Sequence, residues 1–298
     1  KAQKHMAENK KISFAAKDPT TCPVCNEIFH KETLLSGRGR LIAREINPEL
    51  RRIYDPNPKF GLIIPQAYSL TVCPNCWYTA LGNDFSLLAE EKVQEVMNLT
   101  EYRKRMVQAV FNPIIIDFYQ PRTLANGAAS YLLALSTYSF FHHTVAPTVK
   151  RGIFALRAAW LFGDLAMEQP KLKEKFYKIQ EIMYLKSTKF YNNSYDLMIK
   201  NKERIDGVNL GPDTDTNYGY DGFMYLYNYL NFKTSYTEPD ILKKTETYRE
   251  IRRNISKIFG IGKASKERPG PLLNIVRDLY DEVTSYLTDI EETLDINE

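Results

Sequence analysis

Cys22-Pro23-Val24-Cys25 and Cys73-Pro74-Asn75-Cys76 are the two stretches of sequence that decide the fold, and they contain every cysteine of the chain. A CPxC turn aims its two sulfurs at one point, and four thiolates at tetrahedral corners are the ligand set of a closed structural zinc site. Such a site has no open coordination position for catalysis. We therefore predict one structural Zn²⁺ ion. Its ligands are Cys22, Cys25, Cys73 and Cys76.

Three other uses of the four cysteines compete with zinc: a redox dithiol, two structural disulfides and an iron–sulfur cluster. A redox CxxC normally occurs once, at the start of a helix, whereas here the motif is doubled and proline follows each first cysteine. Soft thiolate ligands and the absence of a geometric preference favour Zn²⁺. His30 lies five residues after Cys25, but four cysteines already complete the tetrahedron.

The composition is that of a globular protein of one large or two modest domains. Of its 298 residues 44% are apolar and 26% are charged, which excludes disorder of the whole chain. A net charge of +4 is too small to imply a polyanionic partner by itself.

Nothing in the sequence predicts a membrane span. The longest apolar stretch, 130–141, is short and is interrupted by serine and threonine. We find no signal-peptide pattern, and cysteines suited to a metal favour a reducing compartment, so we expect a cytoplasmic location. The sequence begins at Lys1 rather than methionine, which is consistent with a segment further upstream.

The character of the sequence changes along the chain and predicts three parts. Residues 1–18 are polar and lysine-rich and predict a flexible arm. Residues 19–82 hold both CPxC motifs and many turn residues, which predicts a small zinc-ribbon-like β module. The arginines and acidic residues between the motifs balance, so we interpret that insertion as a solvated face or a docking edge. Residues 83–298 have helical periodicity, and the fold class is therefore mostly α.

Amphipathic stripes define the expected helices of the third part. The segment from Pro147 places Val149, Ile153, Leu156 and Trp160 on one face. The next helix opens at Pro170, and two serines in its stripe leave room for a neighbour. Alternating large and small residues predict antiparallel helices stacked as tetratricopeptide-like repeats. The stripe of the helix from Pro170 comprises Leu172, Phe176, Ile179, Met183, Ser187, Phe190, Ser194 and Leu197. The stripe of the next expected helix comprises Leu242, Tyr248, Ile251, Ile255 and Ile258, and that of the last one Val276, Leu279, Val283, Leu287, Ile290 and Leu294.

We find no catalytic motif, and we do not expect an enzyme. The chain contains no GxGxxG, GxxxxGK[ST], HExxH or GxSxG string. The segment from Asp213 to Asp221 alternates oxygen ligands like a calcium loop, but the required glycine is Tyr218 and the required glutamate is Met224. We interpret it as a solvated acidic turn, and the sequence leaves open whether the loop 206–221 binds an ion.

Taken together, these residues resemble a bacterial family known as domain of unknown function 2225. The resemblance spans roughly 20–287 and is most specific around the two CPxC motifs. It implies a zinc ribbon followed by tetratricopeptide-like helices, and it implies no established reaction. This chain has Trp77 where relatives tend to have glycine. The matching segments are Cys22 to Cys25, Arg38 to Arg44, Pro65-Gln66-Ala67-Tyr68, Cys73 to Ala80 and Ala159-Trp160-Leu161.

Our leading hypothesis is a non-catalytic interaction or scaffold protein whose partner is another protein. Stacked helical repeats present concave faces that bind peptides or helices, and a dense group of tyrosines at 218–229 suits such contacts. The alternative is nucleic-acid binding through the zinc module and the basic segment 243–268. That segment can instead pair with the acidic stretch after Tyr280. The sequence does not identify the partner, the pathway or the oligomeric state.

Overall fold

The computed structural model describes residues 11–213, 218–259 and 270–295. Their contacts divide the chain into two compact units. The first, here called the metal unit, comprises residues up to 45 and 52–142. The second, the helical unit, comprises residues 46–51 and those from 143 onward. The mostly α fold predicted from the sequence is confirmed.

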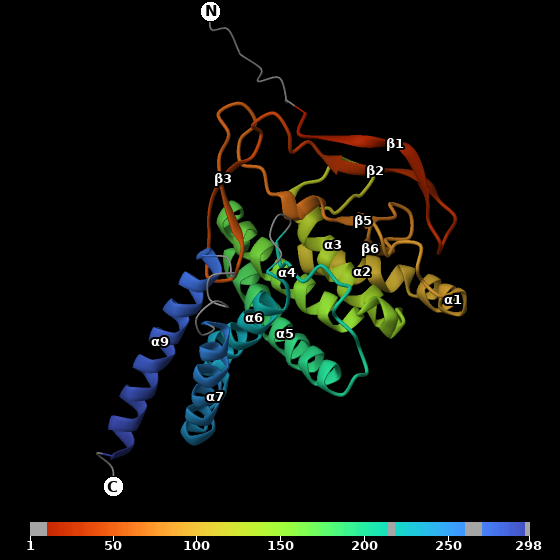
Figure 1. Cartoon of the computed structure of the whole chain (residues 1–298). Helices are drawn as coiled ribbons and strands as arrows, with labels where there is room; N and C mark the ends of the chain where they lie inside the picture. The colour runs from red at the N-terminus through yellow and green to blue at the C-terminus, as the bar shows by residue number, and fades with distance from the viewer. Residues whose placement is uncertain (1–10, 214–217, 260–269, 296–298) are drawn as a thin grey trace, which may run out of the picture. The chain divides into compact units, whose positions relative to one another are not determined.

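The metal unit consists of small two-stranded antiparallel sheets followed by helices (Figure 1). The longest pair, β1 with β2, is in register from Ser13 opposite Leu34 to Thr21 opposite Ile28, with an irregularity between Ala15 and Pro19. Pro19 has no N–H to donate, which suits a strand with an open edge. The elements of the unit are β1 (Ser13–Thr21), β2 (Ile28–Leu34), β3 (Ile42–Ile46), β4 (Arg52–Asp55), β5 (Leu70–Val72), β6 (Thr79–Leu81), α1 (Glu90–Asn98), α2 (Thr100–Phe111) and α3 (Leu124–Thr137).

Two expectations about the chain's division differ from this arrangement. Strand β1 begins at Ser13, inside the range 1–18 expected as a flexible arm, because pairing with β2 satisfies its backbone; residues 1–10 lie outside the described part. The compositional change at 82/83 does not coincide with a unit boundary. Helices up to α3 belong to the metal unit because α3 packs on β5, β6 and the 3-10 turn Pro65–Tyr68, α2 packs on α3, and α1 on α2; in the turn, the carbonyl of Gln66 accepts a 2.7 Å hydrogen bond from Tyr131 of α3.

The helical unit is built from five described helices (Figure 1). Its core contains the predicted stripe residues Val149, Ile153, Leu156 and Trp160, all buried. The repeat character expected from the sequence stays a prediction. The helices are α4 (Pro147–Glu168), α5 (Lys173–Ile199), α6 (Gly219–Thr234), α7 (Ile241–Phe259) and α9 (Gly270–Asp295).

Helices α4 and α5 approach closely where small residues meet. The hydroxyl of Ser187 on α5 donates a 2.9 Å hydrogen bond to the carbonyl of Gly152 on α4, as expected from the serines in the stripe. A Cβ atom at Gly152 would lie 2.8 Å from the ring of Tyr191, which is buried. The absence of a side chain at Gly152 is therefore a packing requirement.

The last two helices pack on each other, and the stripe residues whose side chains are described are buried or half-buried with one exception; the side chain of Leu294 lies outside the described part. Leu242 is 66% exposed, because the contact face of α7 starts only with Thr245 and Tyr248. The predicted calcium-like loop falls partly on 214–217, and the basic segment partly on 260–269; both ranges lie outside the described residues. Asp213, expected in a solvated turn, is buried, and its carbonyl accepts a hydrogen bond from Arg157.

Replacing Gly152 by alanine will destabilise the helical unit. We expect Gly152→Ala to lower the free energy of unfolding by about 1–3 kcal/mol, since overpacking a buried contact outweighs the gain in helix propensity. Urea denaturation followed by circular dichroism measures the change. Gly207→Ala is the control, because a Cβ atom there has no neighbour within 4 Å. Equal stability of the two variants would show that Tyr191 can move aside freely.

Candidate metal centre

The two CPxC motifs fold into knuckles with the same backbone hydrogen bonds. In the first, the amide of Asn26 donates to the carbonyl of Cys22 at 3.0 Å, and the amide of Cys22 donates to the carbonyl of Glu27 at 2.9 Å. In the second, Trp77 donates to Cys73, and Cys73 donates to Tyr78, both at 2.9 Å. Equivalent turns therefore present each pair of sulfurs in the same way.

The turn of each knuckle ends with a residue whose backbone has the left-handed conformation. Asn26 and Trp77 both have φ of 59°, a conformation that glycine adopts without strain and that asparagine tolerates. Trp77 makes the same turn as Asn26. Its side chain is buried and packs edge-on against Phe118 at a centroid distance of 5.3 Å. This burial offsets the cost of the backbone conformation.

The knuckles bring all four sulfurs together. The Sγ atoms of Cys22 and Cys76 lie 3.6 Å apart, those of Cys25 and Cys73 lie 3.5 Å apart, and all four lie within 4.8 Å of one another. Metal–sulfur bonds of about 2.3 Å in a tetrahedron require edges of about 3.8 Å, so the arrangement fits a tetrahedral metal ion. The separations exceed the roughly 2.05 Å of a disulfide bond, and the cysteines are free thiols.

The sulfurs interact strongly with one another. Hydrogen bonds from Cys73 and Cys76 lower the pKa of the Cys22 thiol to about 4. The pKa of Cys76 is raised, because its thiol donates to Cys22 and Cys73 and is buried. The sulfurs therefore share protons, and deprotonating all four at this spacing requires a compensating cation, which a bound metal ion would supply.

Groups around the sulfurs complete the site. The amide of Val24 donates to the Sγ of Cys22 at 3.4 Å, and the side-chain amide of Asn75 donates to the Sγ of Cys25 at 3.6 Å. His30, considered above as an additional ligand, is not part of the cluster within the described residues; its Nδ1 lies 2.8 Å from the carbonyl oxygen of Ala16.

Arg103 is a residue of this site that the sequence did not reveal. Its side chain, on α2, is only 1% exposed, and its Nη2 donates a 2.8 Å hydrogen bond to the carbonyl of Cys76. Burial lowers the pKa of Arg103, while the neighbouring sulfurs of Cys76 and Cys22 act in the opposite direction. A buried guanidinium at this position compensates part of the negative charge of the thiolates. A charged residue in the middle of an amphipathic helix gives no sequence signal for this role.

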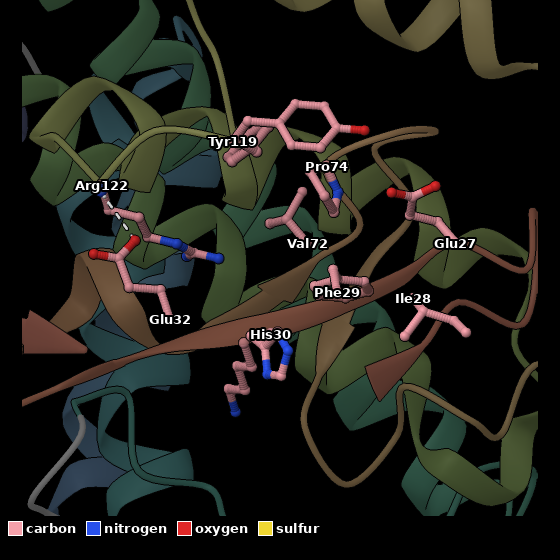
Figure 2. A pocket seen from close by; sticks show the side chains of 11 residues that line it. Glu27, Ile28, Phe29, His30, Glu32, Val72, Pro74, Tyr119 and Arg122 are labelled. Atoms are coloured by element: carbon pink, nitrogen blue, oxygen red, sulfur yellow. Dashed lines mark hydrogen bonds between the residues drawn. The ribbon is translucent and has the colours of Figure 1, made fainter. Parts of the chain in front are cut away.

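A cavity of about 290 Å³ lies beside the second knuckle. Figure 2 shows its lining, which comes from the knuckles, strand β2, Val72 and the segment before α3. Two of its charged residues have partners: Arg122 donates to the carbonyls of Ala67 and Leu70, and Glu32 accepts from the amide of Arg122. Two apolar side chains of its lining, Ile28 and Tyr119, are 67% and 63% exposed.

Removing one ligand will remove the metal. We expect Cys76→Ser to lose stoichiometric bound metal and the fold of the knuckle region, while far-UV circular dichroism retains most of the helical signal, because no cysteine lies in the helical unit. Elemental analysis by mass spectrometry gives the metal content. Ser139→Ala, an exposed change in the same unit, serves as control. Wild-type metal content in the Cys76 variant would refute the ligand assignment.

Arg103 will control how tightly the metal is held. We expect Arg103→Met to release metal to a competing chelator about tenfold faster than wild type, in line with the loss of groups behind metal ligands. Arg103→Lys keeps the charge and will release metal more slowly than the methionine variant. Arg105→Met on the exposed face of α2 is the matched control. Equal rates for the lysine and methionine variants would show that hydrogen bonding, not charge, matters.

Among the described residues no helix is long and apolar enough to cross a membrane. A family model described as an uncharacterized protein conserved in bacteria, domain of unknown function 2225, matches residues 15–283. A curated protein of Borreliella burgdorferi, itself described as an uncharacterized protein, is 36% identical over 286 residues, which is 95% of this chain and 100% of that relative. No solved structure gives a significant match. These matches confirm the resemblance inferred from the knuckles, and the chain belongs to the bacterial family of domain of unknown function 2225.

Proposed function

We propose that this chain is a non-catalytic interaction protein in which a structural zinc ion fixes the shape of the metal unit. The observation that carries the proposal is the closed set of four sulfurs, all within 4.8 Å and three of them from buried cysteines. Four protein ligands leave no position for a substrate. Zinc is the metal we assign, because thiolates are soft ligands and Zn²⁺ accepts a tetrahedron without electronic preference.

The exposed apolar side chains beside the knuckles support a protein partner. Ile28 and Tyr119 are large and exposed, and exposed apolar groups rimmed by polar ones mark interaction surfaces. Glu27 and His30 line the same cavity and supply that polar rim. A partner bound here would sit on a surface whose shape depends on the metal.

The test is capture of partners by the tagged chain in a reducing lysate of the source bacterium, with and without nuclease. We expect a protein that survives nuclease treatment, binds directly when purified, and binds at least tenfold more weakly to Ile28→Glu. Leu242→Glu, a residue of the same type and exposure on α7, is the matched control and will bind as wild type. Capture that nuclease abolishes would replace this proposal by nucleic-acid binding.

The metal itself is checked on the purified protein. Zinc near one equivalent per chain, with no visible absorption, is the expected result. Bound iron together with the visible absorption of an iron–sulfur cluster would overturn the zinc assignment.

A further inference from the structure

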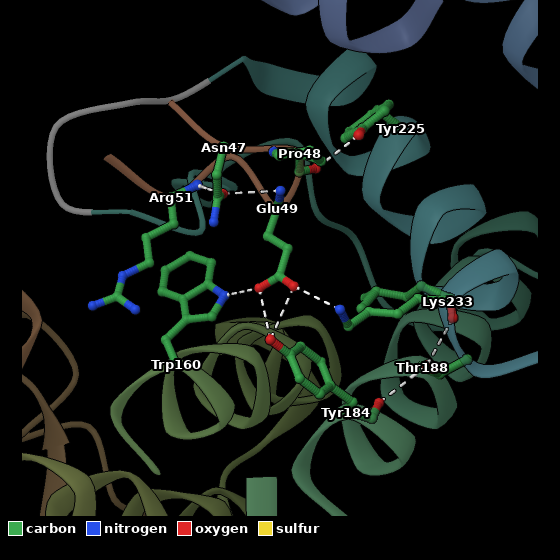
Figure 3. A network of polar contacts seen from close by, with 10 residues as sticks. Asn47, Pro48, Glu49, Arg51, Trp160, Tyr184, Thr188, Tyr225 and Lys233 are labelled. Carbon is green, nitrogen blue, oxygen red and sulfur yellow. Dashed lines mark hydrogen bonds and ion pairs between the residues drawn. The ribbon is translucent and has the colours of Figure 1, made fainter. Parts of the chain in front are cut away.

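Residues 46–51, here called the hairpin tip, connect β3 to β4 yet belong by their contacts to the helical unit. The sequence suggested a solvated face or a docking edge for this insertion; in the tip, Glu49 is 7% exposed and Leu50 is fully buried in the core of that unit. Figure 3 shows the tip among side chains of three helices. The charges of this segment are therefore part of a buried polar network and not of a solvated face.

Three donors from three helices converge on the carboxylate of Glu49. The indole N–H of Trp160 on α4 donates to it, the hydroxyl of Tyr184 on α5 donates at 2.9 Å, and the ammonium of Lys233 on α6 lies 3.0 Å away (Figure 3). Lys233 also lies over the ring of Tyr184, 4.4 Å from its centroid. Burial and the Glu49 charge raise the pKa of Tyr184, so its hydroxyl remains a donor. Together these groups form a site for one carboxylate.

The neighbouring residues of the tip have matching partners. Arg51 donates two hydrogen bonds to the carboxylate of Asp164 on α4, at 3.1 and 2.5 Å, and its guanidinium lies 5.6 Å from the ring centre of Trp160. The hydroxyl of Tyr225 on α6 donates a 2.7 Å hydrogen bond to the carbonyl of Pro48. The helices therefore recognise a glutamate, a leucine, an arginine and one backbone carbonyl in a fixed order.

Hydrogen bonds within the hairpin tip hold it in a tight turn. The side-chain oxygen of Asn47 accepts hydrogen bonds from the amides of Glu49 and Arg51, both at 3.0 Å. The amide of Leu50 donates to the carbonyl of Asn47 at 2.9 Å. These bonds are internal to the turn and favour its shape, which lowers the entropy that binding costs.

Several features make the bound tip replaceable. Leu50 has a left-handed φ of 57°, which is unfavourable for a branched side chain. Buried ion pairs contribute little net stability, because desolvation offsets their attraction. Most residues of β3 are exposed and those of β4 are half-buried, so the burial of this hairpin is concentrated in the tip. A ligand with the same chemistry can therefore compete for the site.

We propose that the helical unit carries a peptide-binding site for a partner loop that presents glutamate, leucine and arginine in a tight turn, and that the hairpin tip occupies this site in cis. The inference rests on the proposed function as an interaction protein and names the chemistry of its partner. Tethering gives the tip a high effective concentration. A partner loop therefore binds well only when the tip has left.

The test uses the full chain and a fluorescent synthetic peptide with the sequence of residues 45–52. We expect the double variant Glu49→Ala/Leu50→Ala, which vacates the site, to bind the peptide at least tenfold more tightly than wild type in fluorescence anisotropy. Adding Lys233→Met will abolish this gain, and a peptide with glutamine at the position of Glu49 will bind at least tenfold more weakly. A folded double variant that does not bind the peptide overturns the proposal.

Amide hydrogen exchange of the wild-type chain provides a second measurement if the double variant does not fold. We expect the amides of Leu50 and Arg51 to exchange at least a hundredfold faster than those in the middle of α4, through local opening of the tip. Exchange of both segments at one common rate would show that the tip opens only with the whole unit, which overturns the proposal.

These outcomes are separable from those of the partner capture. A partner that depends on Ile28 but shows no competition with the peptide leaves the interaction function standing and refutes the peptide site. If the peptide binds but no protein is captured, the peptide site stands and the proposed partner surface at Ile28 is refuted.

Discussion

The mutual repulsion of four sulfur atoms within 4.8 Å is the constraint on which the metal unit depends. Two identical turns, each closed by a residue with φ of 59°, bring these atoms together from distant parts of the sequence. Four thiolates here would require charge compensation, which the buried guanidinium of Arg103 supplies in part and a bound cation would complete. Backbone strain at Asn26 and Trp77 is tolerated because the sulfurs it positions hold two sheets in place.

Much of this centre was readable from the sequence, because cysteines are rare and their spacing is specific. The ligands and the family follow from the two CPxC motifs, and the helical stripes follow from periodicity, as the burial of Trp160 and Ile255 illustrates. Ser187 in the α5 stripe likewise indicated the close approach to Gly152. Such features are local, so neighbouring residues in the sequence are sufficient to predict them.

The features that could not be predicted depend on contacts between distant residues. Arg103 looks like any charged residue of an amphipathic helix, and only the fold places it behind Cys76. Glu49 and Arg51 have the composition of a solvated turn, yet both lie against α4. Leu242 fits the stripe of α7 but lies before the helix meets its neighbour. A balance of charges along a segment does not say which of those charges have buried partners.

Because Cys22 and Cys76 are 54 positions apart, a metal ion bound between them would act as a clasp at the base of a long loop. The entropy of closing such a loop grows only with the logarithm of its length, so that doubling the insertion costs about 0.6 kcal/mol. Evolution can therefore lengthen or shorten the chain between the knuckles while the clasp stays intact. Apart from the hairpin tip, whose Leu50 is buried in the core of the helical unit, the insertion can therefore vary in length at little cost to folding.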